Sequence, residues 1–173
     1  MLTGFQIRAA RSYKNLYIKD VSLAIGMHKS TLTRLEAQTT NLAYINCNTR
    51  TSLLIKNFYE SQKIIFPSNN SIGIRGTTQD FKNTALNKFQ FKISRIATRL
   101  NRKNLGELIG LAESTIEGWE TQQNPLLPIK CNDSNLENLL LTRDFFLDLG
   151  IIYPYHNIVE LLEDPTVDVK KSV

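Results

Sequence analysis

The stretch VSLAIGMHKSTLTRLE, residues 21–36, decides how this chain is expected to fold. It predicts two short helices around a tight turn, with Gly26 at the turn because glycine adopts positive φ at little cost. In the second of these helices Leu32 and Leu35 are three residues apart, so both face the core. Small polar and basic side chains occupy the outward face: Lys29, Ser30, Thr33 and Arg34. A short helix with such a face fits the major groove of double-stranded DNA.

This stretch resembles the helix-turn-helix of the phage-repressor-like family, the Cro/cI or XRE type, whose usual run is L-A-x-x-x-G-V-S-x-S-T-I-S-x-I-E. The turn glycine Gly26, the pair Ser30 and Thr31, and the closing Glu36 stand in register with that run. The opening LTGFQIRAAR, residues 2–11, also resembles the start of a bacterial subgroup of this family. The resemblance implies a DNA-binding transcriptional regulator.

Carried onto this chain, the resemblance implies that base edges are read from a recognition helix over residues 28–38. Lys29 and Arg34 can donate to guanine O6 and N7 or grip phosphates, while Ser30 and Thr33 can bond bases or pack on a thymine methyl. Lys19 and the N-terminus of the preceding helix would hold phosphates, and His28 is expected as a cap or a phosphate neighbour. The family usually holds a phosphate with Gln near the start of that preceding helix. Ile18 stands there in this chain and cannot make that contact.

The second half of the chain repeats the first at an offset of 84 residues. The offset pairs Gly26 with Gly110 and Glu36 with Glu120, together with many other identities in register. Further on, IIFP at residues 64–67 matches IIYP at 151–154 at an offset of 87. A tandem of two helix-turn-helix units is the economical interpretation.

In the second copy Arg102 occupies the phosphate-holding position, followed by Lys103, the counterpart of Lys19. Its recognition helix presents Ser114 together with Glu113 and Glu117. Glutamates can accept from cytosine N4, but they repel phosphates. We therefore expect the first copy to be the stronger DNA reader. The second copy would read a different half-site or serve mainly as an assembly surface.

The expected fold class is mainly α, with two tandem five-helix-like helix-turn-helix (lambda-repressor-like) domains, each carrying a short β-hairpin. The expected boundaries are 1–75 for the first domain, 76–85 for a linker, 86–165 for the second domain and 166–173 for a tail. Thr3 and Gln6 predict a capping box at the start of a helix that runs to about Tyr13. Arg8 and Arg11 on that helix are expected to face solvent.

The composition supports a folded, mildly basic protein. The 173 residues are 42% hydrophobic with a net charge of +5, which fits nucleic-acid binding without establishing it. No apolar run approaches ~18 residues and no secretory signal is visible, so we expect no membrane span and a cytoplasmic location. Cys47 and Cys131 are expected to be small core residues, without a metal or other cofactor. No nucleophile–base pair, metal set or phosphate loop predicts an enzyme.

Double-stranded DNA is the expected partner, and two units in one chain could read half-sites about one helical turn apart. Homodimerisation is compatible with the sequence, and no small-molecule effector is identified by it. The alternative is a protein-interaction or antitoxin-like regulatory module that keeps the fold and uses the second copy mainly for assembly. A steep salt dependence of DNA affinity would separate the two, because phosphate contacts release counterions.

Overall fold

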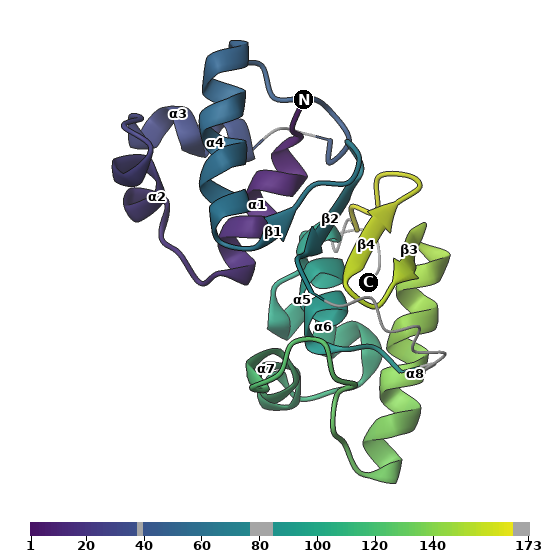
Figure 1. Ribbon diagram of the computed structural model, residues 1–173. Coiled ribbons are helices and arrows are strands. Elements are labelled where there is room, and N and C mark those ends of the chain that lie inside the picture. Colours follow the sequence, from purple (N-terminus) through teal and green to yellow (C-terminus); the bar gives the residue numbers. More distant parts are fainter. Residues whose placement is uncertain (38–39, 77–84, 168–173) are drawn as a thin grey trace. The chain divides into compact units, whose positions relative to one another are not determined.

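The computed structural model describes residues 1–37, 40–76 and 85–167 (Figure 1). The chain divides into two compact units, Met1–Gly76 and Thr77–Val173. Most of the linker expected at 76–85 and of the tail expected at 166–173 lies outside the described residues. At the start of that expected tail, the Val167 amide donates to the Thr98 carbonyl oxygen at 3.3 Å.

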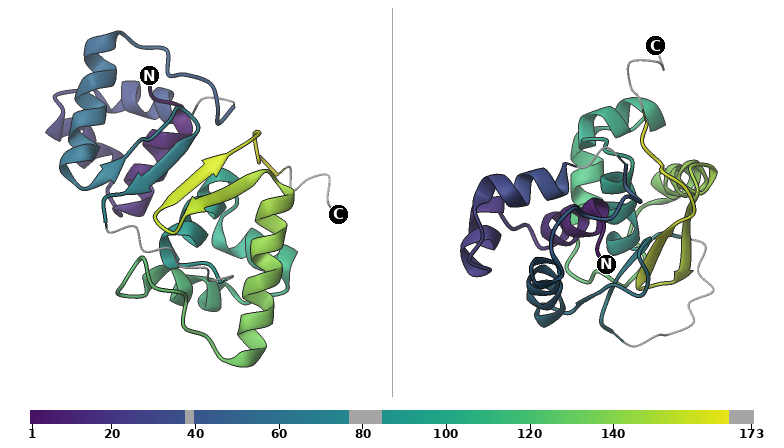
Figure 2. Two further views of the ribbon diagram at one scale, coloured as in Figure 1. Left: turned by 45° about the vertical axis from the view of Figure 1, so that its right-hand side comes forward. Right: turned by 90° about the horizontal axis from the view of Figure 1, so that it is seen from above.

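The first unit combines four helices with one antiparallel hairpin in its described residues. Its elements are α1 (Gly4–Tyr13), α2 (Ile18–Ala24), α3 (Lys29–Glu36), α4 (Thr49–Ser61), β1 (Ile64–Ile65) and β2 (Ser71–Ile74). The helix α1 packs against α3 and β2, while α4 packs against β1. The α2–α3 pair lies on the side of the unit away from the hairpin (Figures 1 and 2).

The buried side chain of Gln6 ties α1 to the hairpin. Its Oε1 accepts from the Thr3 amide and the Thr3 hydroxyl oxygen accepts from the Gln6 amide, so the predicted capping box is confirmed. The Nε2 of Gln6 donates to the carbonyl oxygens of Ser68 and Ser71 at 2.6 and 2.7 Å. One side chain therefore both starts the first helix and holds the hairpin turn against it.

The second unit repeats this order of elements. They are α5 (Lys88–Ala97), α6 (Arg102–Ile109), α7 (Glu113–Thr121), α8 (Asp133–Asp148), β3 (Ile151–Tyr155) and β4 (Ile158–Leu161). Asn87 and Gln90 form the capping box of α5, and the antiparallel β3–β4 hairpin packs beside α8 (Figure 2). The core of this unit includes Phe89, Phe91, Trp119 and Phe146. The Phe91 ring makes an edge-on contact with Trp119 at 5.3 Å between ring centroids.

The same backbone contacts recur in both units at the offset of 84. Thr3 bridges Tyr44 and Asn87 bridges Pro128, each as an isolated antiparallel pair. The turn glycines Gly26 and Gly110 have φ of 64° and 71°. The repeated sequence therefore coincides with repeated geometry.

The expectation of mainly α, five-helix-like domains with a short hairpin is met only in part: each unit forms helices and a hairpin, but its described residues form four helices, and the chain as a whole is mixed α/β. After α4 the chain turns at Lys63, whose φ is 68°, and after α8 it turns at Gly150, whose φ is 74°. Left-handed backbone at these two points ends the helix and returns the chain as a hairpin. The expected recognition helix over 28–38 is also shorter, since α3 spans Lys29–Glu36 with Ala37 as its C-cap. Gln38 lies outside the described residues.

The expectation that Arg8 and Arg11 face solvent is wrong. Arg11 Nε donates to the buried Glu36 carboxylate at 2.8 Å, and Arg8 donates to the Glu36 carbonyl oxygen at 3.0 Å and to Asn41 Oδ1. The side chain of Glu36 is 5% exposed. A buried carboxylate needs a cation and hydrogen bonds, so α1 turns its arginines toward the end of α3.

Candidate nucleic-acid interface

Four residues join α2 to α3, and the turn depends on Gly26. The Met27 amide donates to the Ser22 carbonyl oxygen at 2.8 Å, which closes the turn. A Cβ built on Gly26 would meet no atom within 4 Å. Glycine is therefore favoured here by its positive φ and not by lack of space. This turn sets the direction in which α3 leaves α2.

The helix α3 has one buried and one exposed face. Leu32, Leu35 and Glu36 are buried. The four predicted base-reading residues are all exposed, and they are Lys29, Ser30, Thr33 and Arg34. The structure thus brings the predicted residues together on one uncovered helix surface. The Thr33 hydroxyl donates to the Lys29 carbonyl oxygen at 3.0 Å, and its oxygen can still accept a hydrogen bond.

His28 is the N-cap of α3, one of the two roles expected for it. Its Nδ1 accepts from the Ser30 amide at 3.3 Å and lies 2.7 Å from the Ser30 hydroxyl oxygen. Both side chains are exposed. His28 and Ser30 therefore present two hydrogen-bonding groups at the start of the helix, where they can meet a phosphate or a base.

The basic side chains of this surface are not neutralised by neighbouring carboxylates. Within residues 1–37 and 40–76, neither Lys29 nor Arg34 nor Lys19 on α2 forms an ion pair. The N-terminus of α2 is a weaker phosphate site than expected, since α2 has only seven residues and the Tyr17 side chain does not cap it. Cationic side chains thus dominate this surface.

The equivalent surface of the second unit has the opposite character. Glu113, Ser114 and Glu117 are exposed on α7, as expected. Arg102, expected to hold a phosphate, already forms ion pairs with two carboxylates. Its Nη1 donates to Glu117 at 2.8 Å and its Nε donates to Glu120 at 2.9 Å. Lys103 Nζ lies 3.9 Å from Glu107 Oε1, so this lysine also has an anionic neighbour.

The net charge divides unequally between the two units. Residues 1–76 carry ten Lys and Arg against three Asp and Glu, a net charge of +7. Residues 77–173 carry eleven against thirteen, a net charge of −2. The net charge of +5 of the whole chain is therefore the sum of a strongly basic first unit and a slightly acidic second unit. A polyanion is attracted to the first unit and not to the second.

An ion pair that sequence reasoning missed ties α3 to α1 in the first unit and α7 to α5 in the second. Arg95 Nε donates to Glu120 at 2.6 Å, as Arg11 does to Glu36 in the first unit. The hydrogen bonds to Glu36 raise the pKa of Arg11, although its burial opposes the shift. The signal was present in the repeat, because the Arg-to-Glu spacing of 25 residues occurs in both copies.

The remaining candidate groups lie outside this surface. Cys47 and Cys131 are half-buried free thiols, and burial raises the pKa of both. In the part of the chain that the structure describes, no group of three or more His, Cys, Asp and Glu residues is placed to hold a metal ion. No helix within the same residues is long and apolar enough to cross a membrane.

Comparisons of the chain with protein-family models, curated proteins and solved structures find no match.

Proposed function

We propose that this protein binds double-stranded DNA sequence-specifically as a transcriptional regulator of the bacterial XRE type, with α2 and α3 as its helix-turn-helix. The observation that carries the proposal is the uncovered face of α3. Lys29 and Arg34, without ion pairs to the described residues, flank the hydroxyls of Ser30 and Thr33 there. Donors and small polar groups on one exposed helix face are what major-groove readout uses.

The dimensions of α3 support this function. An α-helix with its side chains is about 10–12 Å in diameter, which matches the width of about 12 Å of the major groove, and the eight residues of α3 would lie within it. Arg34 would donate two of its guanidinium N–H groups to guanine O6 and N7, and such a bidentate pair discriminates by about 1–3 kcal/mol. Lys29 would donate one ammonium proton instead. Lys19 would contact the phosphates beside the groove.

The charge distribution favours the first unit as the reader. Its net charge of +7 attracts DNA, and each phosphate that it neutralises releases a counterion. Affinity should consequently fall steeply with salt concentration.

A second role is favoured for the second unit. Glu113 and Glu117 are exposed on α7, and Glu117 already neutralises Arg102. A surface of this charge repels phosphates, so we propose that this unit serves mainly in assembly, through contact with another protein or a second copy of the chain. An antitoxin-like regulator would use the fold in the same way.

Selection of random duplexes with the full chain at two salt concentrations tests the proposal. The chain should enrich one motif, and its affinity for that motif should fall with salt. Lys29→Ala combined with Arg34→Ala should reduce the affinity for the motif to that for random duplex, while the far-ultraviolet circular dichroism stays that of the folded protein.

The matched control removes the same charge elsewhere. Lys63 and Arg75 are exposed in the first unit and lie outside α3, so Lys63→Ala combined with Arg75→Ala should preserve the selected motif. Equal affinity of the α3 variant and the unmodified chain for the motif would contradict the assignment of α3. No enrichment in the full chain at either salt concentration would favour the protein-interaction role.

A further inference from the structure

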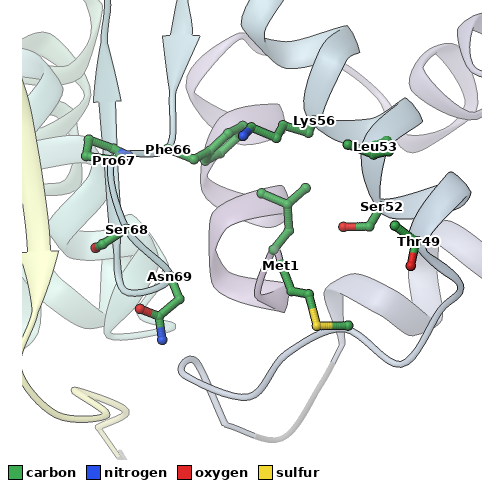
Figure 3. A pocket seen from close by; sticks show the side chains of 10 residues that line it. Met1, Thr49, Ser52, Leu53, Lys56, Phe66, Pro67, Ser68 and Asn69 are labelled. Carbon is green, nitrogen blue, oxygen red and sulfur yellow. The ribbon is translucent and has the colours of Figure 1, made fainter.

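A cleft of about 340 Å³ opens in the first unit between the N-terminal residues, α4 and the turn of the β1–β2 hairpin (Figure 3). Its volume is within the range of small-molecule sites. Apolar walls come from Met1, Leu53 and Phe66. The polar lining includes Thr49, Ser52 and Lys56, which follow one another along one face of α4.

Ser52 is a polar group of this cleft whose hydroxyl is left without a hydrogen bond in the part of the chain that the structure describes. The residue is 8% exposed, and its hydroxyl has no hydrogen-bond partner among the described residues. Figure 3 shows this hydroxyl pointing from α4 into the cleft. Two other helical serines donate to the preceding turn, Ser61 to the Phe58 carbonyl oxygen at 2.7 Å and Ser94 to that of Gln90 at 2.8 Å. The Ser52 hydroxyl is therefore available to a ligand that enters the cleft.

Lys56 lies one turn beyond Ser52 and also lines the cleft. Its Nζ is 3.6 Å from Glu60, in a pair whose side chains are 42% and 34% exposed. Such an exposed pair is weak, and an ammonium group has three protons to donate. A ligand that reaches both Ser52 and Lys56 therefore meets one hydroxyl and one cation on the same helix face.

The repeat shows that the fold does not require these two polar residues. At the offset of 84, Leu136 stands in place of Ser52 and Leu140 in place of Lys56. Leu53 of the lining is likewise replaced, by Glu137, whereas Leu2 matches Leu86. The lining of this cleft, with its polar pair Ser52 and Lys56, is thus a property of the first copy.

We propose that this cleft binds a small carboxylic acid with an apolar body. The carboxylate accepts from the Ser52 hydroxyl and the Lys56 ammonium group, and the apolar body lies against Met1, Leu53 and Phe66. A carboxylate matches the donors, because an ammonium group cannot accept a hydrogen bond and the surrounding unit carries a net charge of +7. This site is separate from α3, so the binding does not depend on the proposed DNA function.

The test is a titration of the full chain with octanoate, followed by nuclear magnetic resonance of the Met1 and Leu53 methyl groups. Octan-1-ol and octylammonium are the comparison probes, since they keep the apolar body and change the head group. Octanoate should shift these methyl signals and bind about tenfold more tightly than octan-1-ol, because the charge-assisted hydrogen bonds are lost with the alcohol.

Ser52→Leu and Lys56→Leu install the residues of the second copy, and each should weaken octanoate binding about tenfold. Ser52→Ala removes the hydroxyl without adding volume, so it replaces Ser52→Leu in this test if the leucine disturbs the fold. Lys63→Leu, an exposed lysine outside the cleft, should leave the octanoate affinity unchanged. The proposal is overturned if octanoate leaves the methyl signals unshifted, if octan-1-ol binds equally well, or if the Ser52 and Lys56 variants bind like the unmodified chain.

Discussion

The buried carboxylate of Glu120 should be the most sensitive polar group of the second unit. Its side chain is 0% exposed and accepts from Arg95 Nε at 2.6 Å, Arg95 Nη2 at 3.1 Å and Arg102 Nε at 2.9 Å. Glu120→Gln keeps the shape of the side chain and removes its charge. Two guanidinium groups then share an uncharged partner, and one side-chain acceptor oxygen is replaced by an amide donor.

The loss of stability in Glu120→Gln can be judged from the burial of Glu120, Arg95 and Arg102. Removing one partner of a buried ion pair costs about 3–5 kcal/mol. The side chains of Arg95 and Arg102 are 13% and 29% exposed, so water partly solvates them and the lower end applies. We expect the free energy of unfolding to fall by about 3 kcal/mol. In urea the midpoint should fall by roughly 1.5 M, for a slope of about 2 kcal/mol per molar.

Trp119 makes the measurement specific. It is the one tryptophan of the chain, it is 4% exposed, and it precedes Glu120 in α7. Its fluorescence during urea denaturation therefore reports the second unit alone. Glu117→Gln is the matched control, since Glu117 also contacts Arg102 but its side chain is 57% exposed, and it should cost less than about 1 kcal/mol. Equal losses in the two variants, or a loss below 1 kcal/mol for Glu120→Gln, would refute the burial argument.

Three further perturbations test other parts of the structure. Burial lowers the pKa of Lys92 to about 8 from its usual 10.5. The folded state therefore binds fewer protons than the unfolded state between these values, and the unfolding free energy of the second unit should rise by about 1–2 kcal/mol between pH 8 and 9.5 relative to Lys92→Met. The same rise in both proteins, measured by Trp119 fluorescence, would contradict this. A Cβ at Gly106 would lie 2.3 Å from the Leu111 carbonyl oxygen, whereas one at Gly26 meets no atom within 4 Å. Gly106→Ala should thus displace the α6–α7 turn and lower the melting temperature of its unit more than Gly26→Ala lowers that of the first, which calorimetry can compare. Glu113→Ala should tighten binding to random duplex if the carboxylates of α7 repel phosphate, and weaker binding in an electrophoretic shift assay would contradict that argument.

The sequence by itself determined the features that depend on residues close along the chain. Thr3 and Gln6 are three residues apart, and their capping box forms within the first turn of α1. Gly26 specifies the turn before α3 because few other residues adopt its positive φ, and Leu32 and Leu35 set the buried face by their spacing. The exposure of Lys29 and Arg34 follows from the same periodicity, since a helix that buries one face exposes the other.

The tertiary structure decided the features that join distant residues. Arg11 meets Glu36 and Arg95 meets Glu120 only because α1 packs on α3 and α5 on α7, and helical periodicity alone had assigned Arg11 to solvent. Arg102 fits a phosphate contact by sequence position, yet the packing of α6 on α7 brings it to two carboxylates. The cleft at Ser52 exists because the hairpin turn and the N-terminal residues approach α4. Spacing along a helix says which side chains share a face, whereas only the packing of that face says which partners they meet.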